Sequence, residues 1–170
     1  MSSRVILIFL DGVGLGTTTP TNPFSRVEQP FLEHLLGGGL VKESAIDTPT
    51  LLLRPLDACL GVPGTPQSAT GQTALLTGVN AAAALGYHLP AFPNDKLVDI
   101  IHRHSILKQV VGRGKRATFA NAYSKDYFLL VERGERAQSV ATHCVLASGT
   151  RFRTIDDLRI GAALTWDIDR

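Results

Sequence analysis

The sequence contains few cysteines: Cys59 and Cys144 are the only two thiols among 170 residues. They lie far apart in the chain, and neither belongs to a Cys-x-x-Cys pair. Small secreted domains that depend on disulfides are dense in cysteine, and thiolate metal sites place cysteines at short, regular spacings. The sequence therefore indicates neither a disulfide framework nor a cysteine-based metal site.

A strong excess of one charge is also lacking, because the net charge is only +2 at pH 7. The longest basic cluster is Arg113-Gly114-Lys115-Arg116, which is typical of a solvated turn, although it could also meet an anionic substrate. Nucleic-acid-binding domains usually carry a basic face or stripe. We therefore expect no nucleic-acid partner.

Long hydrophobic runs are absent as well. The apolar run Val5–Leu10 has only six residues, which is too short for the core of a signal peptide or for a membrane span. We expect no membrane partner and, by default, a cytoplasmic location. A hydrophobic share of 44% in 170 residues is ordinary for a globular chain with one core, so we expect a single domain over residues 1–170. Predicted strands that alternate with predicted helices make it an α/β domain.

The N-terminal segment Arg4–Leu10 combines β-branched and aromatic residues and stops at a glycine-rich turn. This composition predicts a strand buried on both faces, and Asp11 follows it directly. Open α/β sheets bind ligands at the carboxyl ends of their strands, and a carboxylate there suits a divalent cation. Asp11 is therefore a candidate metal ligand, while the alternative that it only caps the following turn stays open.

The glycines Gly12, Gly14 and Gly16 do not form a nucleotide-binding motif. The dinucleotide fingerprint G-x-G-x-x-G requires a glycine at position 17, which is Thr17, and no Gly-Lys-Ser/Thr is present for a phosphate-binding P-loop. We expect these glycines to let the backbone turn tightly after Asp11.

The segment Pro66–Gly78 reads PQSATGQTALLTG and predicts a helix over residues 68–77, with Ser68 as its N-cap. The free N–H groups and the positive end of a helix attract a phosphoryl group and favour a deprotonated hydroxyl. A hydroxyl is nevertheless a weak nucleophile at neutral pH and needs a base or a metal to activate it. The alternative is that Ser68 only caps the helix.

Together these two motifs resemble the alkaline phosphatase superfamily. The resemblance rests on Asp11-Gly12 after the apolar run and on Ser68 followed by Leu75-Leu76-Thr77-Gly78. It is closest to the branch of cofactor-independent phosphoglycerate mutase and phosphopentomutase, whose nucleophile lies three residues before a glycine, as Ser68 precedes Gly71.

The resemblance implies a fold and a site. The expected fold is α/β, with a mostly parallel sheet flanked by helices, and the alkaline-phosphatase-like core would be incomplete in this chain. Asp11 would bind metal, and Ser68 would be the nucleophile and also contact the metal. The complete enzyme would hold two divalent metal ions, manganese or zinc, which activate the hydroxyl and polarise the phosphoryl group of a small phosphorylated substrate.

The chain departs from this branch at two points. The mutases carry His after the glycine, whereas this chain has Gln72, which cannot shuttle a proton. The family completes its metal site with Asp-x-x-x-His and Asp-His, and the chain contains neither. His102 and His104 are expected on a solvated helical face instead. We therefore expect the N-terminal portion of a longer metalloenzyme, whose missing C-terminal portion completes the site.

The sequence thus predicts a metal-dependent phosphoryl-transfer enzyme of the phosphomutase or phosphatase type, acting through Ser68 and inactive as this fragment. The alternative is a non-catalytic truncated relative that acts as a partner-binding module. The local patterns predict helices over residues 31–36, 68–77 and 96–111. They predict extended segments and turns over 45–60, a strand over 116–120, and a loop over 87–94 that could line a cleft. Residues 125–133 are ambiguous, and 139–147 fit a strand or a helix.

Overall fold

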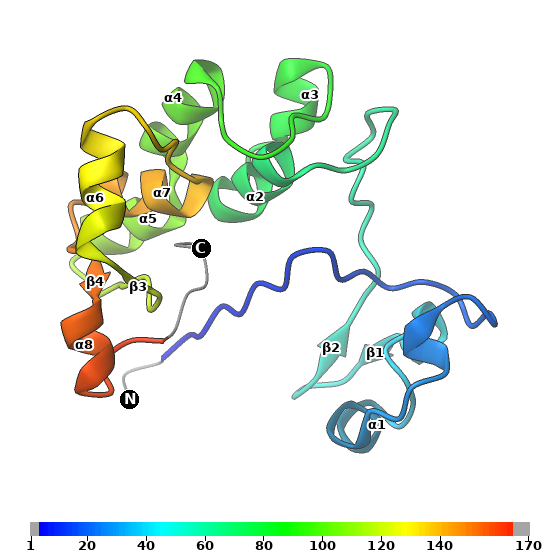
Figure 1. The fold of residues 1–170 in the computed structure, drawn as a ribbon. Coiled ribbons are helices and arrows are strands. Elements are labelled where there is room, and N and C mark those ends of the chain that lie inside the picture. The colour runs from blue at the N-terminus through cyan, green and yellow to red at the C-terminus, as the bar shows by residue number, and fades with distance from the viewer. Residues whose placement is uncertain (1–3, 165–170) are drawn as a thin grey trace. The chain divides into compact units, whose positions relative to one another are not determined.

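A computed structural model describes residues 4–164 and divides the chain into two compact units, Met1–Asp57 and Ala58–Arg170 (Figure 1). Each unit is described by itself. The division concerns contacts within the chain, and the single domain expected over residues 1–170 stays a prediction.

The first unit contains short elements only. In chain order they are the 3-10 helix η1, the helix α1, the 3-10 helix η2 and the strands β1 and β2, with bounds Pro23–Ser25, Pro30–Leu36, Lys42–Ser44, Ile46–Asp47 and Leu52–Leu53. The helix predicted over 31–36 is confirmed, because α1 begins at a proline and ends before Gly37, whose φ of 71° is left-handed. β1 and β2 form an antiparallel pair within the segment predicted as extended.

Apolar side chains of the first unit are mostly exposed. Val41 is the only buried residue among those described in this unit. The strand predicted over Arg4–Leu10 is wrong: the segment forms no strand, and Val5 is 92% and Ile6 86% exposed. A strand needs a neighbour to bond its backbone, and β1 and β2 already bond each other. The apolar residues of this segment would favour burial, but no element of this unit covers them.

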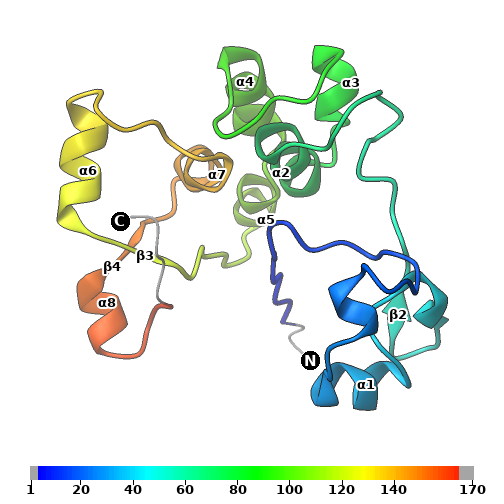
Figure 2. The same ribbon diagram turned by 45° about the vertical axis from the view of Figure 1, so that its right-hand side comes forward.

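The second unit is built from helices α2, α3, α4, α5, α6, α7 and α8, which span Ser68–Thr77, Ala81–Leu85, Asp95–His104, Ile106–Gly112, Lys125–Glu132, Val140–Ser148 and Ile155–Arg159. α2 packs against α3, α4 and α7, and α7 also packs against α4 and α5 (Figure 2). Two apolar clusters form the core, one around Leu97 between α2, α3 and α4, the other around Ile101 and Val140 between α4 and α7. Helix-on-helix packing is thus the main source of burial here.

Two short parallel strands, β3 (Ala122–Tyr123) and β4 (Arg153–Thr154), lie beside these helices. Ala122 pairs with Arg153, and Asn121 makes a parallel bridge to Leu164. Each strand runs directly into a helix, β3 into α6 and β4 into α8. This small sheet is the only parallel pairing of named strands within residues 4–164.

The predicted fold class is therefore wrong. The described residues form mainly helices and two sheets of two strands each, one of them antiparallel, rather than a mostly parallel, alkaline-phosphatase-like core. The strand predicted over 116–120 is not formed, and pairing starts at Asn121. The segments 125–133 and 139–147, for which the sequence left the structure open, both form helices. Ser124 caps α6 and Ser139 caps α7, and each side chain accepts a hydrogen bond from a backbone N–H.

Of the remaining local predictions, two are confirmed and one is wrong. The helix predicted over 68–77 is confirmed as α2, and residues 87–94 form the expected loop. The helix predicted over 96–111 is wrong as a single element, because it breaks at Ser105, whose extended backbone (ψ 130°) separates α4 from α5. Within residues 4–164, no helix combines the length and the apolar character needed to cross a membrane.

Candidate functional site

Ser68 lies on the face of α2 that does not pack against the other helices. Ala69, Thr70, Thr73 and Thr77 are buried and form the packed side. Ser68 shares the opposite side with the residues three, four and seven positions further on, which are Gly71, Gln72 and Leu75. Leu75 is 56% exposed, and no atom lies within 4 Å of the point where a side chain at Gly71 would begin. Ser68, Gly71 and Gln72 are themselves half-buried, so the face that carries Ser68 is partly open to a ligand.

The predicted capping role of Ser68 is wrong by one residue. Gln67 is the N-cap, with extended φ and ψ of −130° and 156°, and it makes no side-chain capping bond. Ser68 is instead the first residue of α2, and its hydroxyl has no hydrogen-bond partner among residues 4–164. The hydroxyl is thus not occupied by the helix, which leaves it available for chemistry.

The backbone N–H groups of the first turn of α2 are only partly bonded. The N–H of Gly71 donates to Gln67 O at 2.9 Å, and that of Ala69 donates to Leu89 O at 3.1 Å. The N–H groups of Ser68 and Thr70 have no acceptor in the described part of the chain. Two free donors at the positive end of a helix, next to a free hydroxyl, form an arrangement that suits an anion.

Thr70 is a second hydroxyl in the same turn, but it is not equivalent to Ser68. Its side chain is almost fully buried, and its hydroxyl donates to Gln67 O at 3.3 Å. Burial and this hydrogen bond keep it away from a ligand on the open face. Ser68 is therefore the only hydroxyl of the first turn placed to act as a nucleophile.

Asp11, the predicted metal ligand, lies in the first unit. It occupies an exposed turn before Gly12, whose φ is 70°, and no hydrogen bond or ion pair joins it to another described residue. Ser68 belongs to the second unit, so each residue is placed only within its own unit. The proximity of Asp11 and Ser68 stays a prediction.

The described residues alone do not provide a metal site. Within residues 4–164, no group of three or more His, Cys, Asp and Glu side chains could hold a metal ion. Neither of the two predicted manganese or zinc ions therefore has its ligand set among these residues. The two ions stay a prediction of the resemblance.

The expected solvated histidine face is only half right. His104 is exposed, but His102 is partly buried and meets His143 of α7 edge to face, with ring centroids 5.8 Å apart. Burial, and then the neighbouring His102, lower the pKa of His143. His143 Nδ1 is buried and has no partner among the described residues. This ring contact joins α4 to α7, which is a packing role.

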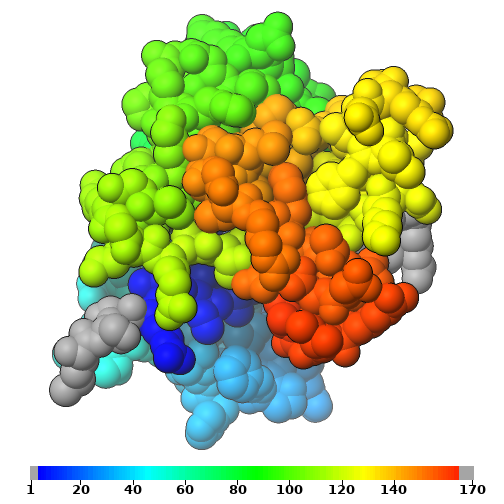
Figure 3. Space-filling model, turned by 90° about the vertical axis from the view of Figure 1, so that its left-hand side faces the viewer, coloured from blue at the N-terminus to red at the C-terminus, as the bar shows by residue number. Residues whose placement is uncertain are grey.

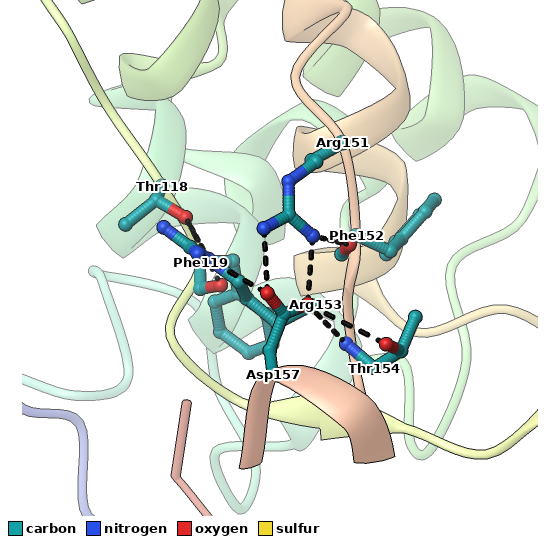
Figure 4. Close-up of polar contacts among 7 residues, drawn as sticks. All are labelled: Thr118, Phe119, Arg151, Phe152, Arg153, Thr154 and Asp157. Atoms are coloured by element: carbon teal, nitrogen blue, oxygen red, sulfur yellow. Dashed lines mark hydrogen bonds and ion pairs between the residues drawn. The ribbon is translucent and has the colours of Figure 1, made fainter. Parts of the chain in front are cut away.

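Asp157 is the centre of a polar cluster that the sequence did not reveal (Figure 4). Its carboxylate accepts two hydrogen bonds from Arg151, at 2.7 and 2.6 Å, and one from the Thr154 backbone N–H at 2.9 Å. Arg153 lies at 3.6 Å and bonds Thr118. The bonds from Arg151, then that from Thr154, hold the pKa of Asp157 far below its usual range. The cluster ties β4 to the start of α8.

Neither cysteine is a candidate nucleophile. Cys144 is buried in the core, and burial raises the pKa of its thiol to about 11, so that the reactive thiolate is scarce at neutral pH. The Cys59 thiol donates to Gly64 O at 3.5 Å. Ser68 therefore stays the best-placed nucleophile of the second unit.

No protein family matches the sequence, and neither a curated protein nor a solved structure matches the chain. The resemblance to the alkaline phosphatase superfamily therefore stays a prediction from its two motifs.

Proposed function

We propose that the chain supplies the serine nucleophile, Ser68, of a metal-dependent phosphoryl-transfer enzyme that acts on a small phosphorylated substrate. The observation that supports this most is the free Ser68 hydroxyl beside the two unbonded N–H groups of Ser68 and Thr70. Such donors match the developing negative charge of a transferring phosphoryl group. The phosphomutase and phosphatase types both remain within this proposal.

In the proposed reaction, Ser68 Oγ forms a bond to phosphorus while the bond between phosphorus and the leaving oxygen breaks. The N–H groups of Ser68 and Thr70 hold the phosphoryl oxygens. Gln72 shares the open face and can donate a hydrogen bond, but it cannot take the proton that Ser68 loses. The proton therefore passes to solvent water, and the described residues alone do not hold the metal ions that the resemblance implies.

One observation favours the alternative of a partner-binding module. The first unit exposes a continuous apolar segment, Val5–Leu10, and buries only Val41 among its described residues. Exposed apolar patches of this kind mark interaction surfaces. This alternative needs no catalytic role for Ser68, so a test of Ser68 separates the two functions.

The test compares wild type with Ser68→Ala in the protein at its full natural length, using a phosphate monoester and manganese. We expect the variant to lose turnover by at least about a thousandfold, as removal of a nucleophile does. Because Ser68 makes no capping bond, the melting temperature should hardly change. Mass spectrometry of the quenched wild type should find phosphate on Ser68.

Thr70→Ala is the matched control. It removes the other hydroxyl of the same turn, which is buried and already bonded, and should leave turnover within a few-fold of wild type. A folded Ser68→Ala protein that keeps wild-type turnover would show that Ser68 is not the nucleophile. Absence of turnover in the wild type would favour the partner-binding module.

A further inference from the structure

A pocket opens in the second unit at the point where the two parallel strands end. Its volume is about 260 Å³, and its lining residues come from the ends of β3 and β4 and from the helices that follow them: Tyr123, Lys125, Thr154, Ile155, Asp156 and Arg159. On the molecular surface, α6 (yellow) and α8 (red) adjoin at this side of the unit (Figure 3). The pocket thus lies at the carboxyl ends of parallel strands, where α/β units bind ligands.

The charges around the pocket favour an anion. Arg159 is paired with Asp156 at 2.8 Å, so these two charges neutralise each other. Lys125 is exposed and has no acidic partner among residues 4–164. The neighbouring arginines do not compete for a ligand, because Arg151 is bound to Asp157 through both of its terminal nitrogens. One uncompensated cation, that of Lys125, is therefore left at the pocket.

The remaining wall of the pocket is apolar. The side chain of Tyr123 is fully buried: its ring packs against Tyr127 and Phe152, and its hydroxyl lies 3.2 Å from Thr142 Oγ1, so Tyr123 closes the pocket from below without offering its ring or its hydroxyl to a ligand. Ile155 is 37% exposed and adds an aliphatic surface. A ligand that matches this pocket combines one acidic group with a small apolar body.

We propose that this pocket binds a small organic anion, with its phosphate or carboxylate group at Lys125 and its apolar part against Ile155. The helices that pack most closely on α2 are α3, α4 and α7, none of which lines the pocket, so the proposal does not rest on the role of Ser68. Ser68→Ala should accordingly bind the same anion as wild type does.

The test is a titration of the ¹⁵N-labelled chain with inorganic phosphate, phenyl phosphate and benzoate, followed by amide NMR shifts. We expect saturable shifts around Tyr123, Lys125 and Ile155, and tighter binding of at least one aromatic anion than of inorganic phosphate. Equal affinity for all three anions, or shifts spread over all basic surface residues, would overturn the proposal. The tighter of the two aromatic anions identifies the acidic group that the pocket prefers.

Three variants sharpen the test. Lys125→Ala should weaken binding about tenfold, because Lys125 is the one cation without an acidic partner among the described residues that line the pocket. Asp156→Asn should strengthen binding about threefold, because it releases Arg159. Lys115→Ala is the matched control, since Lys115 is also an exposed lysine but lies outside the pocket, and the variant should bind as wild type does. Unchanged binding by Lys125→Ala would show that the shifts come from adventitious ions.

Discussion

Two segments that carry apolar side chains, one in each unit, have opposite environments. Val5–Leu10 in the first unit forms no regular structure and is exposed, whereas Val140–Ser148 in the second unit forms α7 and contributes Val140, Cys144 and Val145 to the core. α7 has a capping serine and neighbours in α4 and α5, and Val5–Leu10 has neither within its unit. Hydrophobicity alone therefore decides little, because burial needs a partner surface of the same unit.

The largest expected effect comes from separating the two units. A fragment of residues 58–164 should keep its helical circular dichroism and unfold cooperatively, because it contains nearly all of the buried apolar side chains described. A fragment of residues 1–57, with Val41 as its only buried described residue, should show no cooperative transition. A sharp thermal transition in the shorter fragment would show that the first unit also folds cooperatively by itself.

A second effect compares one leucine from each unit. Leu97 is fully buried between α2, α3 and α4, so Leu97→Ala should cost about 2–5 kcal/mol in unfolding free energy. Leu7 is 64% exposed, so Leu7→Ala should stay within about 0.5 kcal/mol of wild type. Urea titrations of both variants measure the difference. Equal losses would mean that Leu7 is buried in solution.

A third comparison concerns hydroxyl groups. Thr142 Oγ1 of α7 lies 3.2 Å from both the Tyr123 and the Tyr127 hydroxyls and 3.0 Å from Ser139 Oγ, inside the core. Thr142→Val keeps the shape and removes the hydroxyl, which should cost about 1–3 kcal/mol because the two tyrosine hydroxyls lose a buried partner. Thr21→Val in the first unit removes an exposed hydroxyl and should be nearly neutral. Chemical denaturation tests both, and a neutral Thr142→Val would show that the two tyrosine hydroxyls find other partners.

The sequence predicted those parts of the fold that depend on local signals. α1 and α2 were found because each ends at a glycine, and α1 also begins at a proline. The strand over Arg4–Leu10 was predicted wrongly because a strand needs a neighbour to pair with, and a local pattern contains no information about that neighbour. The break at Ser105 was missed because the apolar periodicity continues across it into α5.

The candidate site was predicted in part for the same reason. The position of Ser68 at the start of a helix follows from local sequence, but its free hydroxyl does not. The Leu89 carbonyl accepts the N–H of Ala69 from a loop twenty residues away, and this contact helps to complete the first turn in place of a side-chain cap. The Asp157 cluster was missed because Arg151 and Thr118 approach it only in the folded chain, although the Thr154-x-x-Asp157 capping box was readable as a helix start.

The smallest expected effect compares two ion pairs, one in each unit. Asp47 and Arg54 form an exposed pair in the first unit, and such pairs contribute little. The carboxylate of Asp157 in the second unit is shielded and accepts several charge-assisted bonds, so Asp157→Asn should lower the melting temperature at pH 7 more than Asp47→Asn does.

The pH dependence of this effect follows from the lowered pKa of Asp157. In the unfolded chain this carboxyl titrates near about 3.9, so its stabilising effect is complete above that pH and is lost as the pH falls through the lower folded pKa. The gap between wild type and Asp157→Asn should therefore narrow between pH 5 and pH 2, roughly the window in which the group takes up its proton. A gap that stays constant over this range would mean that Asp157 acts through its neutral hydrogen bonds and not through its charge.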